Sequence, residues 1–233
     1  MRPWQGVLFD LDGTLLDTAR DLGGALNDLL ADCGRPPLPA AEIRPWASHG
    51  SGALIRLAFG LTAGEEFDAL RERFLDRYAE RIALETRLFP GGEALLEGIE
   101  GAGLRWGVVT NKPAFLTDPL LAALGLDRRA ACVVSGDTLP QKKPHPAPLL
   151  HAAALAGLDP TACVYLGDAE RDVQAARAAG MTPLVALFGY LGDHDDPASW
   201  GAAASVDSLT DFAAWLGLHE PRPAGTAPHS TAG

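Results

Sequence analysis

Short apolar runs alternate along the chain with longer stretches in which apolar residues recur at helical spacing. The runs are continuous rather than alternating, as expected for strands that are covered on both faces. They comprise residues 7–9, 106–109, 131–134, 163–166 and 183–187. The helical stretches lie near 91–102, 114–124, 146–157 and 170–179. This order of elements predicts an α/β fold built on a doubly wound parallel sheet.

A long insert separates the first predicted strand from the second. Within residues 17–88, apolar side chains follow helical spacing over 22–30 and again over 70–82, and there is no convincing strand. The run Arg-Pro-Pro-Leu-Pro at 35–39 separates one helix from the next, because proline cannot continue a helix. We therefore expect an inserted all-α cap domain.

These patterns divide the chain into three parts. Residues 1–16 and 89–218 are expected to form the α/β core, and residues 17–88 the helical cap. Residues 219–233 are rich in proline, glycine, serine and threonine and have little apolar content, which predicts a flexible tail.

Charge narrows the range of partners. The 233 residues carry a formal net charge of -11. An acidic surface repels nucleic-acid backbones and anionic lipids, so we expect neither nucleic acid nor membrane as a partner. A phosphorylated ligand would be repelled as well, unless local cations overcome that field.

The three cysteines, Cys33, Cys132 and Cys163, are too widely spaced to suggest a disulfide framework or a zinc site. Free thiols are typical of a reducing cytosol. The first apolar run is shorter than the ~7–15 residues of a secretion signal. No stretch approaches the ~20 apolar residues of a membrane span. We therefore expect a cytoplasmic protein.

Polar side chains stand where the predicted strands end. In open α/β sheets the ligand lies just beyond the carboxyl ends of the strands, so residues far apart in the sequence would meet there. The residues are Asp10, Asp12, Thr110, Asn111, Asp168 and Asp172.

Asp10 and Asp12 have a spacing that suits phosphoryl transfer. A carboxylate at a strand end can attack phosphorus and form an aspartyl-phosphate, while a second carboxylate protonates the leaving group and then activates water. Gly13 would permit the tight turn between them and the chain that follows. The alternative is that Asp12-Gly13 only marks a turn, as an isolated Asp-Gly pair usually does.

Phosphoryl transfer also requires that the charge on the phosphoryl oxygens be neutralised. Asp10, Asp168 and the backbone carbonyl of Asp12 make an oxygen-only set that suits Mg²⁺.

Three further residues can contact phosphate oxygens. Thr110 offers a hydroxyl, Asn111 a backbone N–H and Lys143 a compact ammonium. Lys142 competes with Lys143 for that last role, but Lys143 directly precedes Pro144 and Lys142 is expected to be solvated.

In this order the polar residues resemble the four motifs of the haloacid dehalogenase superfamily, and the helical insert resembles its C1 cap. The resemblance covers about residues 5–216. The motifs are Asp-x-Asp-Gly-Thr at 10–14, Thr-Asn at 110–111, Lys-Pro at 143–144 and Gly-Asp-x-x-x-Asp at 167–172.

The resemblance implies a Rossmann-like core and a role for each motif. Asp10 would be the nucleophile, Asp12 the general acid/base and Lys143 the residue that steadies the transferring group, while Thr110 would bind phosphate. The implied cofactor is Mg²⁺, held by Asp10, Asp12, Asp168 and Asp172.

Asp172 also has a simpler reading, as a charge in the first turn of a helix where the macrodipole favours it. Ala169 stands where many relatives carry a polar residue, so Asp172 would have to support the metal site alone.

Two branches of the superfamily share further segments with this chain. Residues 11–18, 109–113 and 136–146 resemble phosphoglycolate phosphatases, which implies 2-phosphoglycolate as the first candidate substrate. Residues 106–112 and 189–201 resemble a branch that hydrolyses N-acetylmuramic acid 6-phosphate in cell-wall recycling. The sequence does not separate the two.

The cap is expected to decide specificity. His49 lies in a predicted flexible loop, 49–52, which either faces the substrate or merely connects two helices. One cap arginine could grip a substrate carboxylate by a bidentate pair. The candidates are Arg44, Arg56, Arg73, Arg77 and Arg81.

Two other functions share parts of this pattern. A sugar phosphomutase of the same superfamily would return the phosphoryl group to a sugar. A receiver module also surrounds a phosphorylated aspartate with acidic residues, but it places the acceptor on a later strand and has no helical insert. A closing cap excludes water and macromolecules. We therefore expect a phosphomonoesterase, monomeric or homodimeric, that acts on a small phosphorylated metabolite.

Overall fold

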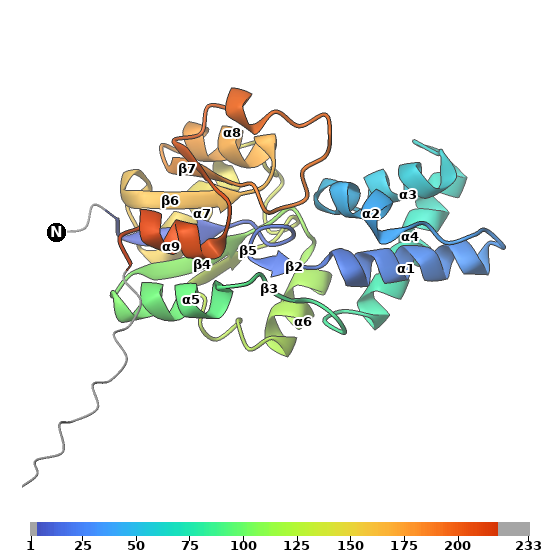
Figure 1. The fold of residues 1–233 in the computed structure, drawn as a ribbon, viewed down its shortest axis with the longest axis horizontal. Coiled ribbons are helices and arrows are strands. Elements are labelled where there is room, and N and C mark those ends of the chain that lie inside the picture. The colour runs from blue at the N-terminus through green and yellow to red at the C-terminus, as the bar shows by residue number, and fades with distance from the viewer. Residues whose placement is uncertain (1–3, 219–233) are drawn as a thin grey trace, which may run out of the picture.

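Six parallel strands form the sheet at the centre of the α/β core (Figure 1). The computed structural model describes residues 4–218, and the predicted tail lies outside these residues. Every neighbouring pair in the order β5-β4-β1-β6-β7-β8 is parallel, which confirms the predicted fold class. The bounds are Gly6–Phe9 (β1), Arg105–Val109 (β4), Cys132–Val134 (β5), Cys163–Gly167 (β6), Thr182–Ala186 (β7) and Ala204–Val206 (β8).

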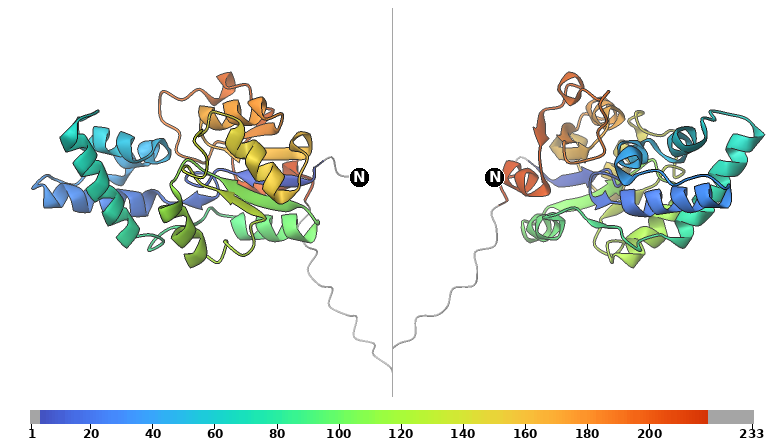
Figure 2. Two further views of the ribbon diagram at one scale, coloured as in Figure 1. Left: turned by 180° about the vertical axis from the view of Figure 1, so that it is seen from behind. Right: turned by 45° about the vertical axis from the view of Figure 1, so that its right-hand side comes forward.

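Helices cover both faces of this sheet, α5 and α9 on one face and α7 and α8 on the other (Figures 1 and 2). Side chains alternate along a strand, so Val7 and Phe9 of β1 join the buried cluster of α5 and α9, whereas Leu8 joins that of α7 and α8. The helices are α5 (Gly92–Gly101), α6 (Ala114–Ala123), α7 (Ala147–Ala156), α8 (Glu170–Ala178) and α9 (Leu209–Trp215), with 3₁₀ turns η2 (Pro160–Ala162) and η3 (Pro197–Ser199).

The sequence pattern does not predict the last strand and helix. β8 has only three residues, Ala-Ser-Val, at the edge of the sheet, so it produces no apolar run. Helix α9 is seven residues long, which is about two turns and too short for a clear helical period. Within residues 4–218, no helix combines the length and the apolar character needed to cross a bilayer.

Four helices form the insert, which lies to one side of the sheet (Figure 1). Helices α1 and α4 pack along each other, with Leu26 and Leu29 of α1 and Phe74 and Tyr78 of α4 buried in the same apolar cluster. We propose 17–88 as the boundaries of this cap. Its elements are α1 (Ala19–Asp32), α2 (Ala40–Ile43), η1 (Arg44–His49), α3 (Ser51–Phe59) and α4 (Glu65–Glu80).

The predicted flexible loop at 49–52 is wrong. The 3₁₀ helix η1 ends at His49 and α3 begins at Ser51, so Gly50 alone connects them. Gly50 has a φ of 82°, in the left-handed region that favours glycine, and this lets the chain turn sharply between two helices.

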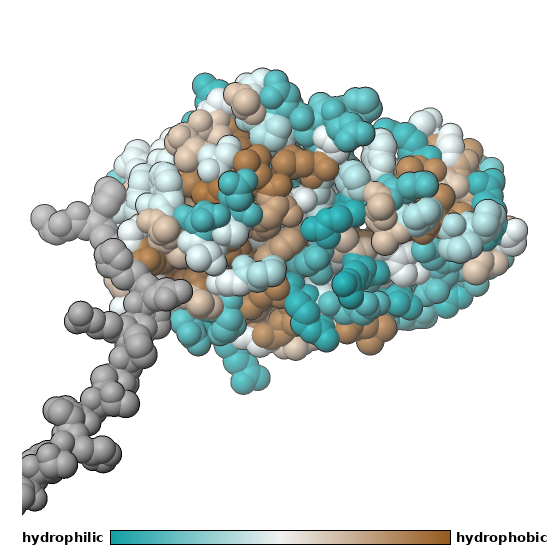
Figure 3. Space-filling model, viewed as in Figure 1, coloured by the Kyte–Doolittle hydropathy of each residue, from teal (hydrophilic) through white to brown (hydrophobic). Residues whose placement is uncertain are grey.

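The chain passes twice between the core and the cap. Strands β2 (Leu16–Asp17) and β3 (Arg87–Leu88) pair there as a two-residue antiparallel ladder, which is too short to show a periodic pattern in the sequence. Figure 3 shows hydrophilic residues gathered over this junction. One exposed ion pair near it joins Arg20 to Glu85 at 3.5 Å.

A buried carboxylate ties the two passages together. Asp21, in the first turn of α1, is 0% exposed. It accepts hydrogen bonds from the backbone N–H of Glu85 at 3.0 Å, from that of Thr86 at 2.8 Å and from the Thr86 hydroxyl at 2.7 Å. Helix α1 is therefore anchored to the segment that leads back into β3.

Replacing Asp21 by alanine is expected to destabilise the protein, because three donors would lose their acceptor in a buried site. The expected loss in the free energy of unfolding is about 3 kcal/mol, measured by urea denaturation. Asp28→Ala is the matched control on the same helix, since its ion pair with Arg81 is exposed and should contribute less than about 1 kcal/mol. Equal losses in the two variants would contradict the anchoring role.

Candidate active site

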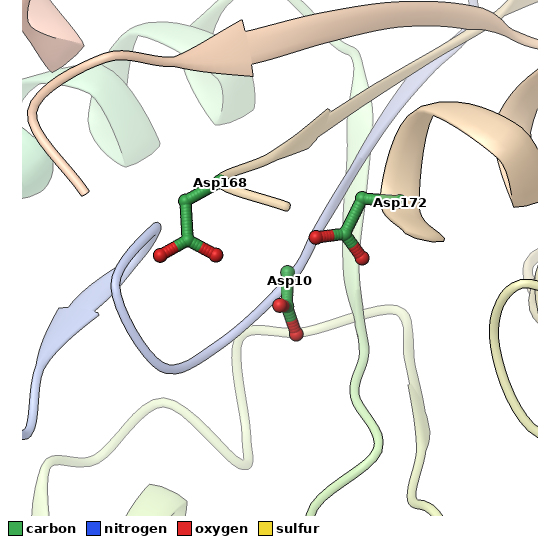
Figure 4. Close-up of side chains that lie close together, drawn as sticks. All are labelled: Asp10, Asp168 and Asp172. Carbon is green, nitrogen blue, oxygen red and sulfur yellow. The ribbon is translucent and has the colours of Figure 1, made fainter. Parts of the chain in front are cut away.

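Three carboxylates converge at the end of β1 (Figure 4). Asp10 follows β1, Asp168 follows β6 and Asp172 lies in the first turn of α8. One oxygen from each lies within 4.8 Å of the others, and none of the three residues is more than 3% exposed. Strand β1 lies between β4 and β6, where the strand order reverses, so the site is at the position where open α/β sheets bind ligands.

The turn after Asp10 brings the chain very close to Asp168. Gly13 has a φ of 83°, and a Cβ built on it would collide with Oδ2 of Asp168. Only glycine therefore fits both the backbone conformation and the available space. This is the physical reason for the glycine in the Asp-x-Asp-Gly segment.

Asp168 has one satisfied and one unsatisfied oxygen. Oδ2 accepts from the Ser48 hydroxyl at 2.6 Å and from the Tyr190 backbone N–H at 2.9 Å. Oδ1 is buried and has no hydrogen-bond partner among the described residues. Burial, reinforced by the charges of Asp10 and Asp172, raises the pKa of Asp168 to about 7. A cation beside Oδ1 would offset the free-energy cost of keeping Asp168 ionised in this buried position.

Asp172 makes two contacts, one within the first turn of its own helix and one with Lys143. Its Oδ2 accepts from the backbone N–H of Ala169 at 3.1 Å and so closes the amino-terminal end of α8. Its Oδ1 lies 2.7 Å from the ammonium of Lys143. Burial raises its pKa, an effect that Lys143 opposes and Asp10 reinforces.

Lys143 sits between two of the carboxylates, with Nζ 2.8 Å from Oδ1 of Asp10 as well as close to Asp172. Nζ also lies 2.8 Å from the Tyr165 hydroxyl. The Asn111 side chain fixes the backbone on both sides of Lys143, donating to its carbonyl at 3.0 Å and accepting from its N–H at 3.1 Å. This double contact is a use of Asn111 that the sequence does not reveal.

Thr110 lies at the end of β4 and lines the same cavity as Asp10 and Asp12. Its backbone N–H donates to the carbonyl of Val134 at 2.9 Å, which continues the ladder between β4 and β5. Its hydroxyl oxygen accepts from the backbone N–H of Lys112 at 3.1 Å.

Asp12 is held by two side chains that come from different parts of the molecule. Its Oδ1 accepts from the Thr18 hydroxyl at 2.7 Å and from Nζ of Lys112 at 2.8 Å. That ammonium also lies over the ring of Tyr78 in the cap, 4.5 Å from its centroid. Burial opposes its charge, but Asp12 and Tyr78 together outweigh this and raise the pKa of Lys112, so it stays charged. Sequence reasoning does not find this role, although Lys112 directly follows Thr-Asn.

A cavity of about 390 Å³ opens between this site and the cap. His49 lines it, with its ring 5.9 Å from that of Trp46. Burial and the charge of Arg171 lower the pKa of His49, so it is neutral at pH 7 and offers hydrogen bonds rather than charge. Arg171 lines the cavity as well and donates to the carbonyl of Ser48 at 2.7 Å. The sequence signals neither Ser48 nor Arg171, because their partners are distant in the chain.

Most of the cap arginines proposed as carboxylate ligands are engaged elsewhere. Arg44 pairs with Asp17 at 2.9 Å and Arg77 with Asp32 at 2.9 Å. The cap arginine that lines the cavity is Arg71, which the sequence pattern does not single out.

A model of the haloacid dehalogenase-like hydrolase family matches residues 7–186, so the chain belongs to that family. This agrees with the motif order seen in the sequence and sets the chain apart from receiver modules. The chain is a phosphoric monoester hydrolase of this family.

Named relatives cover nearly the whole chain. A phosphoglycolate phosphatase of Xanthomonas campestris pv. campestris is 47% identical over 92% of this chain and 99% of its own length. An N-acetylmuramic acid 6-phosphate phosphatase of Pseudomonas aeruginosa is 42% identical over 87% of this chain and 90% of its own. The crystal structure of a predicted phosphoglycolate phosphatase from Haemophilus somnus aligns with a TM-score of 0.81 at 29% identity, covering 92% of this chain and 99% of that chain.

Proposed function

We propose that this phosphatase depends on Mg²⁺ and hydrolyses a small phosphorylated metabolite through an aspartyl-phosphate on Asp10. The observation that carries this proposal is the grouping of Asp10, Asp168 and Asp172. Lys143 pairs with Asp10 and Asp172, and Asp10 lines the cavity. A cytoplasmic location is part of the proposal, because the three cysteines are free thiols.

Asp10 is oriented for attack. Its Oδ1 accepts from the backbone N–H of Leu11 at 2.7 Å and pairs with Lys143, and among the described residues these contacts leave Oδ2 unengaged. Oδ2 would attack phosphorus, and the bond from phosphorus to the leaving oxygen would break. Asp12 would donate a proton to that oxygen and later take one from the water that hydrolyses the aspartyl-phosphate.

The charge on the transferring group would be balanced from two sides. Lys143 contributes an ammonium, and Thr110 and the backbone N–H of Asn111 contribute donors for phosphate oxygens. Asp10, Asp168 and the carbonyl of Asp12 would hold Mg²⁺, which suits an all-oxygen set, and the unsatisfied Oδ1 of Asp168 supports this. When bound, the ion would neutralise charge on the phosphoryl oxygens. Asp172, engaged by Lys143 and by α8, would support the ion through water.

The first candidate substrate is 2-phosphoglycolate, after the relatives that are 47% identical. A second candidate, N-acetylmuramic acid 6-phosphate, is favoured by a specific observation. The cavity of about 390 Å³ is large for a two-carbon acid, and Leu22, Phe74 and Leu75 give it an apolar wall that such an acid would not use.

Asp10→Asn is expected to lower phosphate release by at least about a thousandfold, because an amide oxygen is a poor nucleophile. The fold should be retained, which circular dichroism and the melting temperature would establish. Asp28→Asn, at the surface of α1, is the control and should keep full activity. Substantial hydrolysis by the Asp10 variant would refute the covalent mechanism.

Adding Mg²⁺ is expected to raise the melting temperature of the wild-type protein but not that of Asp168→Asn. A ligand at 100 times its Kd stabilises the folded state by about 2.7 kcal/mol, which is a shift of several degrees. Without metal, the variant should melt at or above the wild-type temperature, because it lacks one of three mutually repelling carboxylates. The same Mg²⁺ shift in both proteins would exclude Asp168 as a ligand.

A panel of phosphomonoesters tests the substrate. We expect kcat/KM for 2-phosphoglycolate or N-acetylmuramic acid 6-phosphate to exceed that for glucose 6-phosphate by about tenfold or more, the range that one well-formed polar contact supplies. A preference for simple hexose phosphates would contradict both candidates.

A further inference from the structure

We propose that Arg71 binds a carboxylate of the substrate on the opposite side of a sugar ring from the phosphate, so that the enzyme selects phosphorylated sugar acids. This inference rests on the proposed function, in which the phosphate lies at Asp10. It decides between the two candidate substrates in favour of the larger one.

One face of α4 carries the argument. Arg71, Phe74, Leu75 and Tyr78 have the spacing i, i+3, i+4, i+7, so they share one face of the helix, and all four line the cavity. Tyr78 marks the catalytic end of this face, because its ring contacts the ammonium of Lys112. Arg71 lies two helical turns away, roughly 10 Å along the axis.

The guanidinium of Arg71 is positioned but not neutralised. Its Nε donates to the hydroxyl of Ser51, at the start of α3, at 2.9 Å. That contact leaves both terminal nitrogens for a bidentate carboxylate pair. Among the described residues Arg71 has no ion pair with a carboxylate. The neighbouring arginines of this helix and its end pair with carboxylates of α1, Arg73 and Arg77 with Asp32 and Arg81 with Asp28.

The other cations that line the cavity are less suited to a second anionic group. Lys112 is engaged by Asp12. Arg171 is engaged by the carbonyl of Ser48 and lies beside the carboxylate cluster. Lys142 is exposed, as Arg71 is, but it belongs to the core, where it directly precedes Lys143 and therefore lies on the side of the cavity where the phosphate would bind. Arg71 is the cavity-lining cation of the cap.

The span between the two ends defines the substrate class. A two-carbon phosphate ester holds its carboxylate only a few bonds from phosphorus and would not extend over two turns of α4. A sugar 6-phosphate with a carboxylate-bearing ether on its ring would place phosphate at Asp10, its ring along the apolar wall of Phe74 and Leu75, and its carboxylate at Arg71.

The test uses two pairs of esters that differ by a carboxylate. N-acetylmuramic acid 6-phosphate is paired with N-acetylglucosamine 6-phosphate, and 2-phosphoglycolate with ethyl phosphate. Arg71→Gln is expected to lower the kcat/KM ratio of the sugar pair by about 30-fold, as for the loss of a charge-assisted contact, and that of the two-carbon pair by less than about threefold. Arg71→Lys should keep part of the preference, because it keeps the charge but not the bidentate geometry.

Arg73→Gln is the matched control, on the same helix but paired with Asp32, and it should leave both ratios unchanged. The inference is overturned if Arg71→Gln leaves the sugar-pair ratio unchanged, or if it lowers the two-carbon ratio as much. It is also overturned if the wild type hydrolyses 2-phosphoglycolate but neither sugar, an outcome under which the proposed phosphatase function stands. Failure of the wild type to hydrolyse any of the four esters with Mg²⁺ would instead refute the proposed function.

Discussion

Mutual repulsion among three buried carboxylates is the constraint on which the rest of the site depends. Asp10, Asp168 and Asp172 lie in a low-dielectric environment, where like charges cannot all ionise without compensation. Lys143 offsets two of them, since its ammonium lies 2.8 Å from Asp10 and 2.7 Å from Asp172. The negative charge that Lys143 does not offset is centred on Asp168, whose Oδ1 has no hydrogen-bond partner among the described residues. In the proposed mechanism, a cation held at this excess of negative charge lets an acidic protein accept an anionic phosphate at the same point.

The buried parallel sheet holds the three carboxylates close together despite their repulsion. Strand β1 lies between β4 and β6, and its apolar residues pack against helices on both faces. Asp10, the proposed nucleophile, therefore follows a strand that is paired on both sides. Gly13 then lets the chain reverse directly against Asp168, which a residue with a Cβ could not do. Support of this kind holds catalytic groups more precisely than a loop alone would.

The cap contacts the acidic residues of the candidate active site directly. Its Ser48 donates to Asp168, and its Tyr78 lies over the ammonium of Lys112 that pairs with Asp12. Any movement of the cap would therefore change the contacts of Asp12 and Asp168 in the core. The same helix that carries Tyr78 also carries Arg71 at the far end of the cavity. One helix, α4, thus connects the proposed catalytic site with the proposed carboxylate site.

The sequence by itself determined β1, β4, β5, β6 and β7 with the helices α5 to α8, the parallel sheet, the helical insert and the acidic residues at the strand ends. These follow from local apolar periods and from residue types that only a few chemistries require. The tertiary structure alone decided which side chains complete the site. Ser48 contacts Asp168 across 120 positions and Lys112 contacts Asp12 across 100, so no local pattern encodes either contact. It also decided that Arg71, rather than Arg73 or Arg77, faces the cavity. The helical period places arginines on several faces of α4, and only the packing of α4 against α1 decides which face stays open.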